Sequence, residues 1–102
     1  MNVIENRMRP IHPGEFLRED FLAPLGMSAS ALASALHVST ARINGILKEE
    51  RELTADMAYR LARYFDTTPD FWLNLQATYS LKTLPTRDEI DREVIRREPK
   101  QR

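Results

Sequence analysis

Polar side chains that can hydrogen-bond to base edges and phosphates recur over residues 39–48 of the chain. They are Ser39, Thr40, Arg42, Asn44 and Lys48. Hydroxyl and amide groups can bond to bases, with asparagine favouring adenine and arginine favouring guanine, and lysine suits a phosphate. Gly45 in the same stretch would allow the backbone to approach DNA closely. These residue types fit DNA recognition, although an ordinary solvated helix face has a similar composition.

The residues that must position this set form two short predicted helices, over residues 28–36 and 39–47. Each begins with a serine, whose side chain can cap the free N–H groups of a helix start. Only residues 37 and 38 separate the two helices, so they must cross at a steep angle, as in a helix-turn-helix. We predict that the second helix enters the major groove of DNA.

The apolar residues of the pair suit this crossing. Ala33 is small enough for close contact between two helices, and Val38 and Ile43 would fill the angle between them. The polar residues at 39, 40, 44 and 48 then share the opposite face, with Arg42 at its margin. Ser28 could also bond a phosphate at the positive end of its helix, but capping alone is an equal explanation.

Three further helices and a tail complete the predicted all-α architecture. The first begins in His12-Pro13-Gly14-Glu15 and ends at Pro24 and Gly26, the fourth begins at Thr54, and the fifth runs from about Pro69 to Tyr79. We therefore expect an N-terminal arm over residues 1–11, a five-helix domain over 12–80, and a charged tail over 81–102. A short helix over 87–97 is possible in that tail.

The fifth predicted helix carries more apolar surface than a terminal helix needs. Its large side chains are Phe71, Trp72, Leu75 and Tyr79. We interpret these residues as a homodimer interface, with a purely core role as the alternative. A dimer is expected on independent grounds, because one short recognition helix reads too few base pairs for useful specificity.

Composition limits the possible functions of the 102-residue chain. The formal net charge is zero, which argues against a nonspecific nucleic-acid binder but not against a sequence-specific one. Cysteine is absent, so disulfides and thiolate metal sites are excluded. No apolar run is long enough to cross a bilayer, and no secretory pattern begins the chain. We expect a soluble, cytoplasmic protein that contacts no membrane.

No combination of residues indicates catalysis. His12 and His37 lie 25 residues apart and have no partner motif for metal binding or base catalysis. Adjacent acids such as Glu49 and Glu50 do not converge on one point of a helix. Because no nucleophile–base set, phosphate loop or metal-ligand spacing is present, we expect no enzyme activity, no metal and no cofactor.

Several segments occur in the order found in a known family. These are HPGEFL at 12–17, the helix pair at 28–48, TADMAYRLA at 54–62 and PDFWLNLQ at 69–76. Over about residues 10–80 the chain resembles the HigA family of antitoxins, within the larger lambda-repressor-like (Xre) class of helix-turn-helix proteins. It departs from the family pattern in having His37 where the turn often has glycine, and Glu49-Glu50 directly after the second helix of the pair.

The resemblance implies three activities. Family members dimerise, bind a palindromic operator in their own promoter, and neutralise a HigB-type toxin, which is a ribosome-dependent mRNA endonuclease. We therefore expect an antitoxin that represses its own operon. The alternatives are a repressor without a toxin partner, and a helical protein–protein adaptor.

Overall fold

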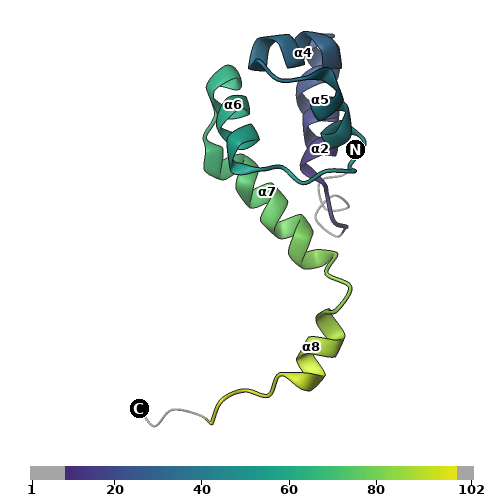
Figure 1. The fold of residues 1–102 in the computed structure, drawn as a ribbon, viewed down its shortest axis with the longest axis vertical. Helices are drawn as coiled ribbons and strands as arrows, with labels where there is room; N and C mark the ends of the chain where they lie inside the picture. Colours follow the sequence, from purple (N-terminus) through teal and green to yellow (C-terminus); the bar gives the residue numbers. More distant parts are fainter. Residues whose placement is uncertain (1–8, 99–102) are drawn as a thin grey trace.

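The computed structural model describes residues 9–98, and this part of the chain contains helices and no strand. The helical segments are α2 (Pro13–Phe16), the π-helical segment η1 (Leu17–Leu22), α3 (Ala23–Leu25), α4 (Ala29–Leu36), α5 (Thr40–Leu47), α6 (Ala55–Phe65), α7 (Pro69–Lys82) and α8 (Arg87–Glu93) (Figure 1). The predicted all-α class is confirmed. Because α2, η1 and α3 form one continuous helix, residues 9–98 contain five helices followed by a sixth, α8, in the tail.

The first helix contains a feature that the sequence pattern did not predict. Within η1 the hydrogen bonds widen to a spacing of five residues, so that the Ala23 N–H donates to the Arg18 carbonyl. This wider turn accommodates Pro24, which lacks an N–H and would crowd a regular α-helix. The helix ends at Leu25, where Gly26 adopts a left-handed conformation with φ of 61°. Gly26 thus ends the helix as predicted, whereas Pro24 lies within its last turn.

Capping side chains fix the starts of the four following helices. In each case a hydroxyl oxygen accepts a hydrogen bond from the backbone N–H three residues later. The capping residues are Ser28, Ser39, Thr54 and Thr68. Ser28, Ser39 and Thr54 were predicted as helix starts from their residue types, and these starts are confirmed. Thr68 directly precedes the predicted start of the fifth helix at Pro69.

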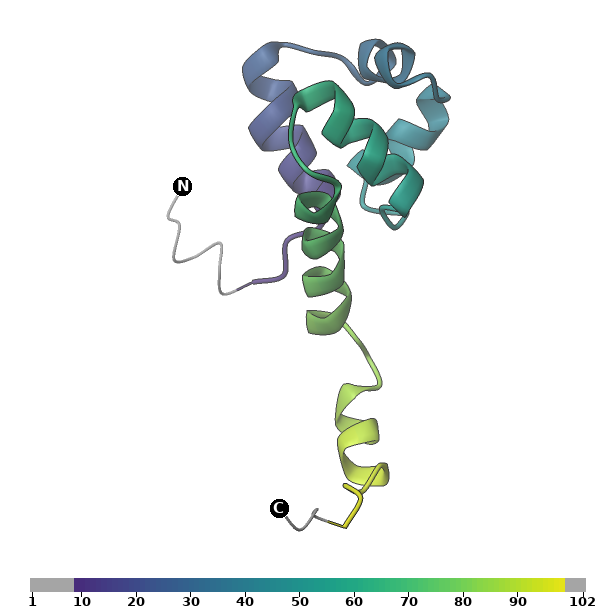
Figure 2. The ribbon, with the colours of Figure 1, turned by 90° about the vertical axis from the view of Figure 1, so that its left-hand side faces the viewer.

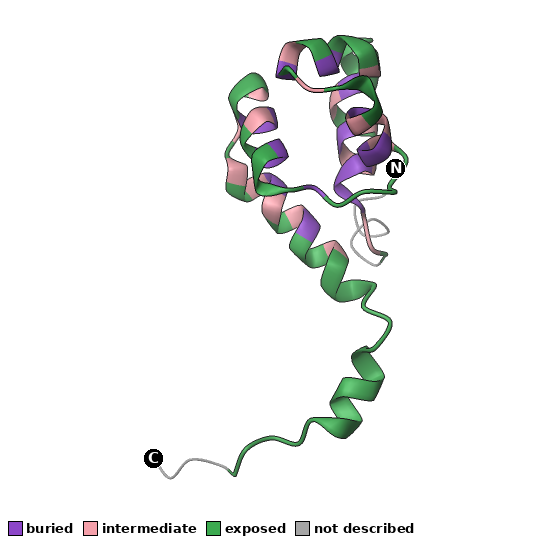
Figure 3. Cartoon of the chain, viewed as in Figure 1, coloured by how far each residue is buried: buried purple, intermediate pink, exposed green. Residues whose placement is uncertain are grey.

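The core forms where the first five helices meet, and Figure 3 shows the buried residues on their facing sides. Leu17, Leu32, Ile43, Leu61 and Trp72 are each 0% exposed. The indole N–H of Trp72 donates to the hydroxyl of Thr67 at 2.8 Å. Trp72 therefore has no side-chain surface left for a partner, and its assignment to a dimer interface was wrong.

The C-terminal part of the chain, which includes α8, does not pack against the other helices. Helix α7 continues to Lys82, beyond the predicted end at Tyr79, and α8 ends at Glu93, short of the predicted 97. Every residue of α8 is exposed, and Figure 2 shows the helix projecting away from the other helices. Most of the predicted arm over residues 1–11 lies outside the described residues. No helix within residues 9–98 is long and apolar enough to cross a membrane.

Candidate nucleic-acid interface

Four of the predicted contact residues lie on α5 or cap its two ends, and none of them is buried. Ser39, Thr40 and Lys48 are exposed, and Asn44 is half-buried. On the opposite side of the helix, Ile43 and Ile46 belong to the core. The Lys48 side chain forms no ion pair with any other residue in the described part of the chain. We call Ser39, Thr40, Asn44 and Lys48 the polar face of α5.

Arg42 does not belong to this polar face. Successive residues of an α-helix turn by about 100°, which places Arg42 far around the helix from Thr40. One terminal nitrogen of its guanidinium donates to the Asp56 carboxylate at 3.2 Å. The prediction placed Arg42 at the margin of this face, as a possible contact to bases or phosphates, and the structure directs its side chain towards α6.

Gly45 has an intramolecular neighbour where the prediction placed DNA. The residue is buried, and a β-carbon added to it would lie 2.7 Å from Cδ of Arg51. The missing side chain therefore makes room for Arg51, in the loop that follows α5. In this arrangement the Arg51 side chain covers Gly45, and the close approach of the Gly45 backbone to DNA stays a prediction.

Ser28 begins α4, the first helix of the pair, and remains exposed. Its hydroxyl oxygen accepts a hydrogen bond from the Ala31 N–H at 3.0 Å. The turn between α4 and α5 contains His37 in the left-handed conformation, with φ of 60°. This is the position where glycine is common, and a non-glycine residue there carries a small conformational cost.

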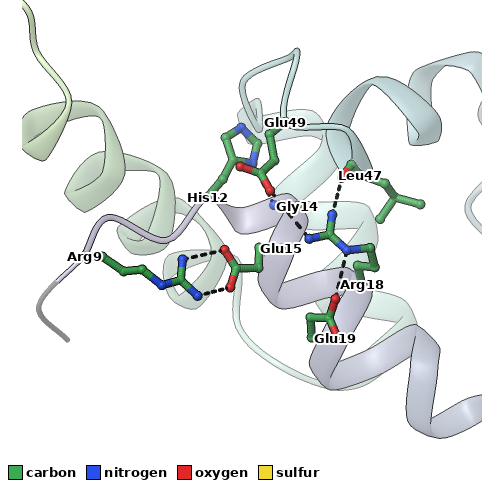
Figure 4. A network of polar contacts seen from close by, with 8 residues as sticks. All are labelled: Arg9, His12, Gly14, Glu15, Arg18, Glu19, Leu47 and Glu49. Carbon is green, nitrogen blue, oxygen red and sulfur yellow. Dashed lines mark hydrogen bonds and ion pairs between the residues drawn. The ribbon is translucent and has the colours of Figure 1, made fainter. Parts of the chain in front are cut away.

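The first helix holds the C-terminal end of α5 (Figure 4). Gly14 packs directly against the backbone of Ile46. The guanidinium of Arg18 donates to the Leu47 carbonyl at 2.5 Å and lies 3.6 Å from the Glu49 carboxylate. An arginine at this position satisfies a carbonyl that the helix end leaves without a partner.

His12 begins the first helix as a buried cap. Its side chain is 3% exposed, and Nδ1 accepts a hydrogen bond from the Gly14 N–H at 2.8 Å. The imidazole meets the ring of Tyr79 edge-on at 4.9 Å between centroids. Burial lowers the pKa of His12 below its ordinary value of 6.5, opposed by the Glu49 charge. The signal for this cap was available in the sequence, because the residue before a first-turn proline occupies the cap position.

Helix α6 holds the other end of the helix pair. The Arg60 guanidinium donates to the Leu36 carbonyl at 2.8 Å, at the C-terminus of α4. It also donates to the Asp56 carboxylate at 2.7 Å. The hydrogen bond from Arg60, followed by that from Arg42, lowers the pKa of Asp56 below its ordinary value. Sequence reasoning found neither the Arg60–Leu36 contact nor the Arg42–Asp56 contact, because each joins two helices that are distant in the sequence.

The loop after α5 is held by α7. The side-chain oxygen of Gln76 accepts a hydrogen bond from the Leu53 N–H at 2.7 Å, and its amide nitrogen donates to the Ser80 hydroxyl. The loop places Glu49, with φ of 63°, and the exposed Glu50 next to Lys48. Arg18 offsets the charge of Glu49, whereas Glu50 has no such partner among residues 9–98.

Chemistry at this surface is limited to binding by hydrogen bonds and charge. Within residues 9–98, no group of three His, Asp or Glu side chains is arranged to hold a metal ion. The polar face of α5 offers hydroxyl, amide and ammonium groups on a helix that three other helices hold in place. That combination suits insertion into a groove that presents both base edges and phosphates.

Comparison with known proteins identifies relatives of the chain. The helix-turn-helix family model matches residues 17–72. Virulence-associated protein I of Dichelobacter nodosus is 58% identical over 78 residues, covering 76% of this chain and 72% of that protein. Among solved structures, the Pseudomonas aeruginosa antitoxin HigA with the higBA promoter has a TM-score of 0.83 and 50% identity over 85% of this chain and 97% of its own. The antitoxin GraA in complex with its operator has a TM-score of 0.84 and 52% identity over 90% and 95% of the two chains.

Proposed function

Because the chain belongs to the helix-turn-helix family, within its HigA antitoxin group, we propose that it is an antitoxin that binds operator DNA through α5. The observation that carries this proposal is the polar face of α5, supported on its reverse side by the core. Relatives about half identical in sequence have been solved with a promoter or an operator. The function is binding without catalysis.

In this proposal, the residues of the polar face of α5 contact different parts of the DNA. Thr40 and Asn44 present a hydroxyl and an amide for base edges, with adenine the favoured partner of Asn44. Ser39 and Lys48, near the two ends of α5, are placed for the phosphate backbone. Ser28, at the start of α4, is a further phosphate contact in this proposal.

Two copies of the chain would read a palindromic operator. For the interface we retain Phe71, Leu75 and Tyr79, which are partly buried and leave part of their surface open. Trp72 supports this surface from within the core. Partly exposed apolar side chains on one helix suit an interface between two copies, because association removes them from water.

The family resemblance gives the second partner, a HigB-type toxin that cleaves mRNA. The test is co-expression with the adjacent reading frame, scored by growth and by co-purification. We expect the antitoxin to restore growth and to co-purify with a small basic protein. If the adjacent protein is harmless when expressed alone, the chain is a repressor without a toxin partner.

A variant separates toxin neutralisation from DNA binding. Asn44→Ala/Lys48→Ala removes two groups from the polar face and leaves the core intact. We expect this variant to restore growth as the wild type does and to lose repression of a promoter reporter. Loss of both activities together, in a variant that still folds, would contradict the assignment of α5 to DNA alone.

A further inference from the structure

The side chain of Asp56 connects the recognition helix α5 to the helix that supports it. Its carboxylate accepts hydrogen bonds from Arg42 of α5 at 3.2 Å and from Arg60 of α6 at 2.7 Å. Arg60 in turn donates to the Leu36 carbonyl of α4 at 2.8 Å. The Asp56 carboxylate therefore contacts the Arg42 side chain of α5 directly, and it is linked to the end of α4 through Arg60.

We propose that Asp56 is a positioning residue for DNA specificity, which holds Arg42 beside the groove and away from base edges. The inference rests on the proposed binding of DNA through α5. When the polar face of α5 points into the major groove, a side chain on the flank of the helix points to the groove wall, where the phosphate backbone runs. Asp56 keeps Arg42 on that flank.

The consequence concerns specificity more than affinity. Arginine is long, permanently charged and bonds readily to guanine and to any phosphate. While it is paired with Asp56, the guanidinium of Arg42 is less available to the nearby phosphates. Without that carboxylate, Arg42 would bind phosphates on any sequence, and each added phosphate contact strengthens binding regardless of sequence. Asp56 thus limits the affinity for unrelated DNA while the polar face selects the operator.

The arrangement also predicts that loss of Asp56 leaves the fold intact. Asp56 is about half exposed, and Arg42 and Arg60 are about one-third exposed. Ion pairs with this degree of solvent contact contribute little to stability. The neutral amide in Asp56→Asn keeps the size of the side chain and can still accept a hydrogen bond.

The experiment measures binding of the full chain to its promoter fragment and to an unrelated fragment of equal length, at several salt concentrations. We expect Asp56→Asn to lower the ratio of promoter to unrelated affinity by about two- to fivefold, in line with the coupling of one solvent-exposed pair. We also expect a steeper salt dependence on unrelated DNA. Circular dichroism and thermal unfolding should remain close to the wild type.

A double variant distinguishes positioning of Arg42 from a general change of charge. In the background of Arg42→Ala, the Asp56→Asn change should leave the affinity ratio unaltered. An unchanged ratio in the single variant, or an equal fall in both backgrounds, would overturn the inference. Failure of the wild type to prefer its promoter would overturn the proposed function instead, so the two failures are distinguishable.

Discussion

Gly14 at the start of the first helix lies against the backbone of Ile46 in α5, so closely that a β-carbon on Gly14 would overlap the Ile46 carbonyl oxygen. The first helix therefore reaches the recognition helix through backbone contact. Arg18, one turn further along, binds the carbonyl of the next residue, Leu47. The position of α5 consequently depends on a residue with no side chain.

Gly14→Ala should destabilise the protein by about 3 kcal/mol, the upper part of the range for overpacking, because the obstacle is backbone and cannot rotate away. The measurement is the free energy of unfolding in urea. Gly26→Ala is the matched control, because a β-carbon there meets nothing within 4 Å. That control should cost only about 1 kcal/mol, from its left-handed backbone. Equal costs for the two variants would contradict the close packing of Gly14.

The stability of the fold should fall as the pH drops below 6.5. The pKa of His12 is lowered by burial, so below 6.5 the unfolded chain takes up a proton that the folded chain does not. The unfolding free energy then decreases with falling pH until the folded pKa is reached. Nearby Glu49 opposes this shift and Arg18 adds to it.

His12→Asn keeps a side chain that can cap the helix and removes the titration at this position. Its unfolding free energy should vary less between pH 7 and pH 5 than that of the wild type. The control is His37→Asn, at the exposed histidine, which should retain the wild-type dependence. If His12→Asn retains the full dependence, the acid sensitivity arises elsewhere.

Glu50→Gln should strengthen DNA binding about two- to threefold at low salt, because it removes a negative charge two residues from Lys48. The gain should disappear as salt increases. Glu93→Gln in α8 makes the same charge change far from α5 and should have a smaller effect (Figure 1). An unchanged affinity for Glu50→Gln would place this loop away from the phosphate backbone.

Substitutions of Trp72 and Leu75 should have different effects, the first on the stability of the fold and the second on dimerisation. Trp72→Ala should destabilise the fold by about 3–5 kcal/mol, because it empties a fully buried position. Leu75→Asp should shift the mass measured by sedimentation towards the monomer while the helical content remains. A wild type that is monomeric at micromolar concentration would contradict the interface proposed on α7.

Local signals in the sequence predicted the helix starts well. Ser28, Ser39, Thr54 and Thr68 each combine a capping side chain with a following apolar pattern, and both features act within one helical turn. The wide turn at Leu17–Leu22 escaped prediction, because regular helical spacing gives no sign of a change in hydrogen-bond register. Trp72 was misassigned, because an apolar helix face does not reveal whether its partner is the same chain or another.

Around α5, too, local sequence predicted some features, whereas features that depend on contacts with other helices were not predicted. Thr40, Asn44 and Lys48 were placed together by helical spacing alone, and the structure keeps them on one face. Arg42 was placed at the margin of this face and Gly45 close to DNA, but the sequence did not predict their intramolecular neighbours, which come from outside α5. Asp56 and Arg51 determine what those two residues do, and neither contact has a signature in local sequence.

Operator binding by the polar face of α5 is tested most directly by fluorescence anisotropy with the chain's own promoter fragment. Lys48→Ala removes a positive charge from that face, and Arg63→Ala removes one from the exposed side of α6. We expect nanomolar-range binding by the wild type, typical of specific protein–DNA complexes, and a loss of about tenfold or more for Asn44→Ala/Lys48→Ala. The control variant Asn44→Ala/Arg63→Ala should lose less affinity for the promoter fragment. Equal affinity of the wild type and the Asn44→Ala/Lys48→Ala variant would contradict the account.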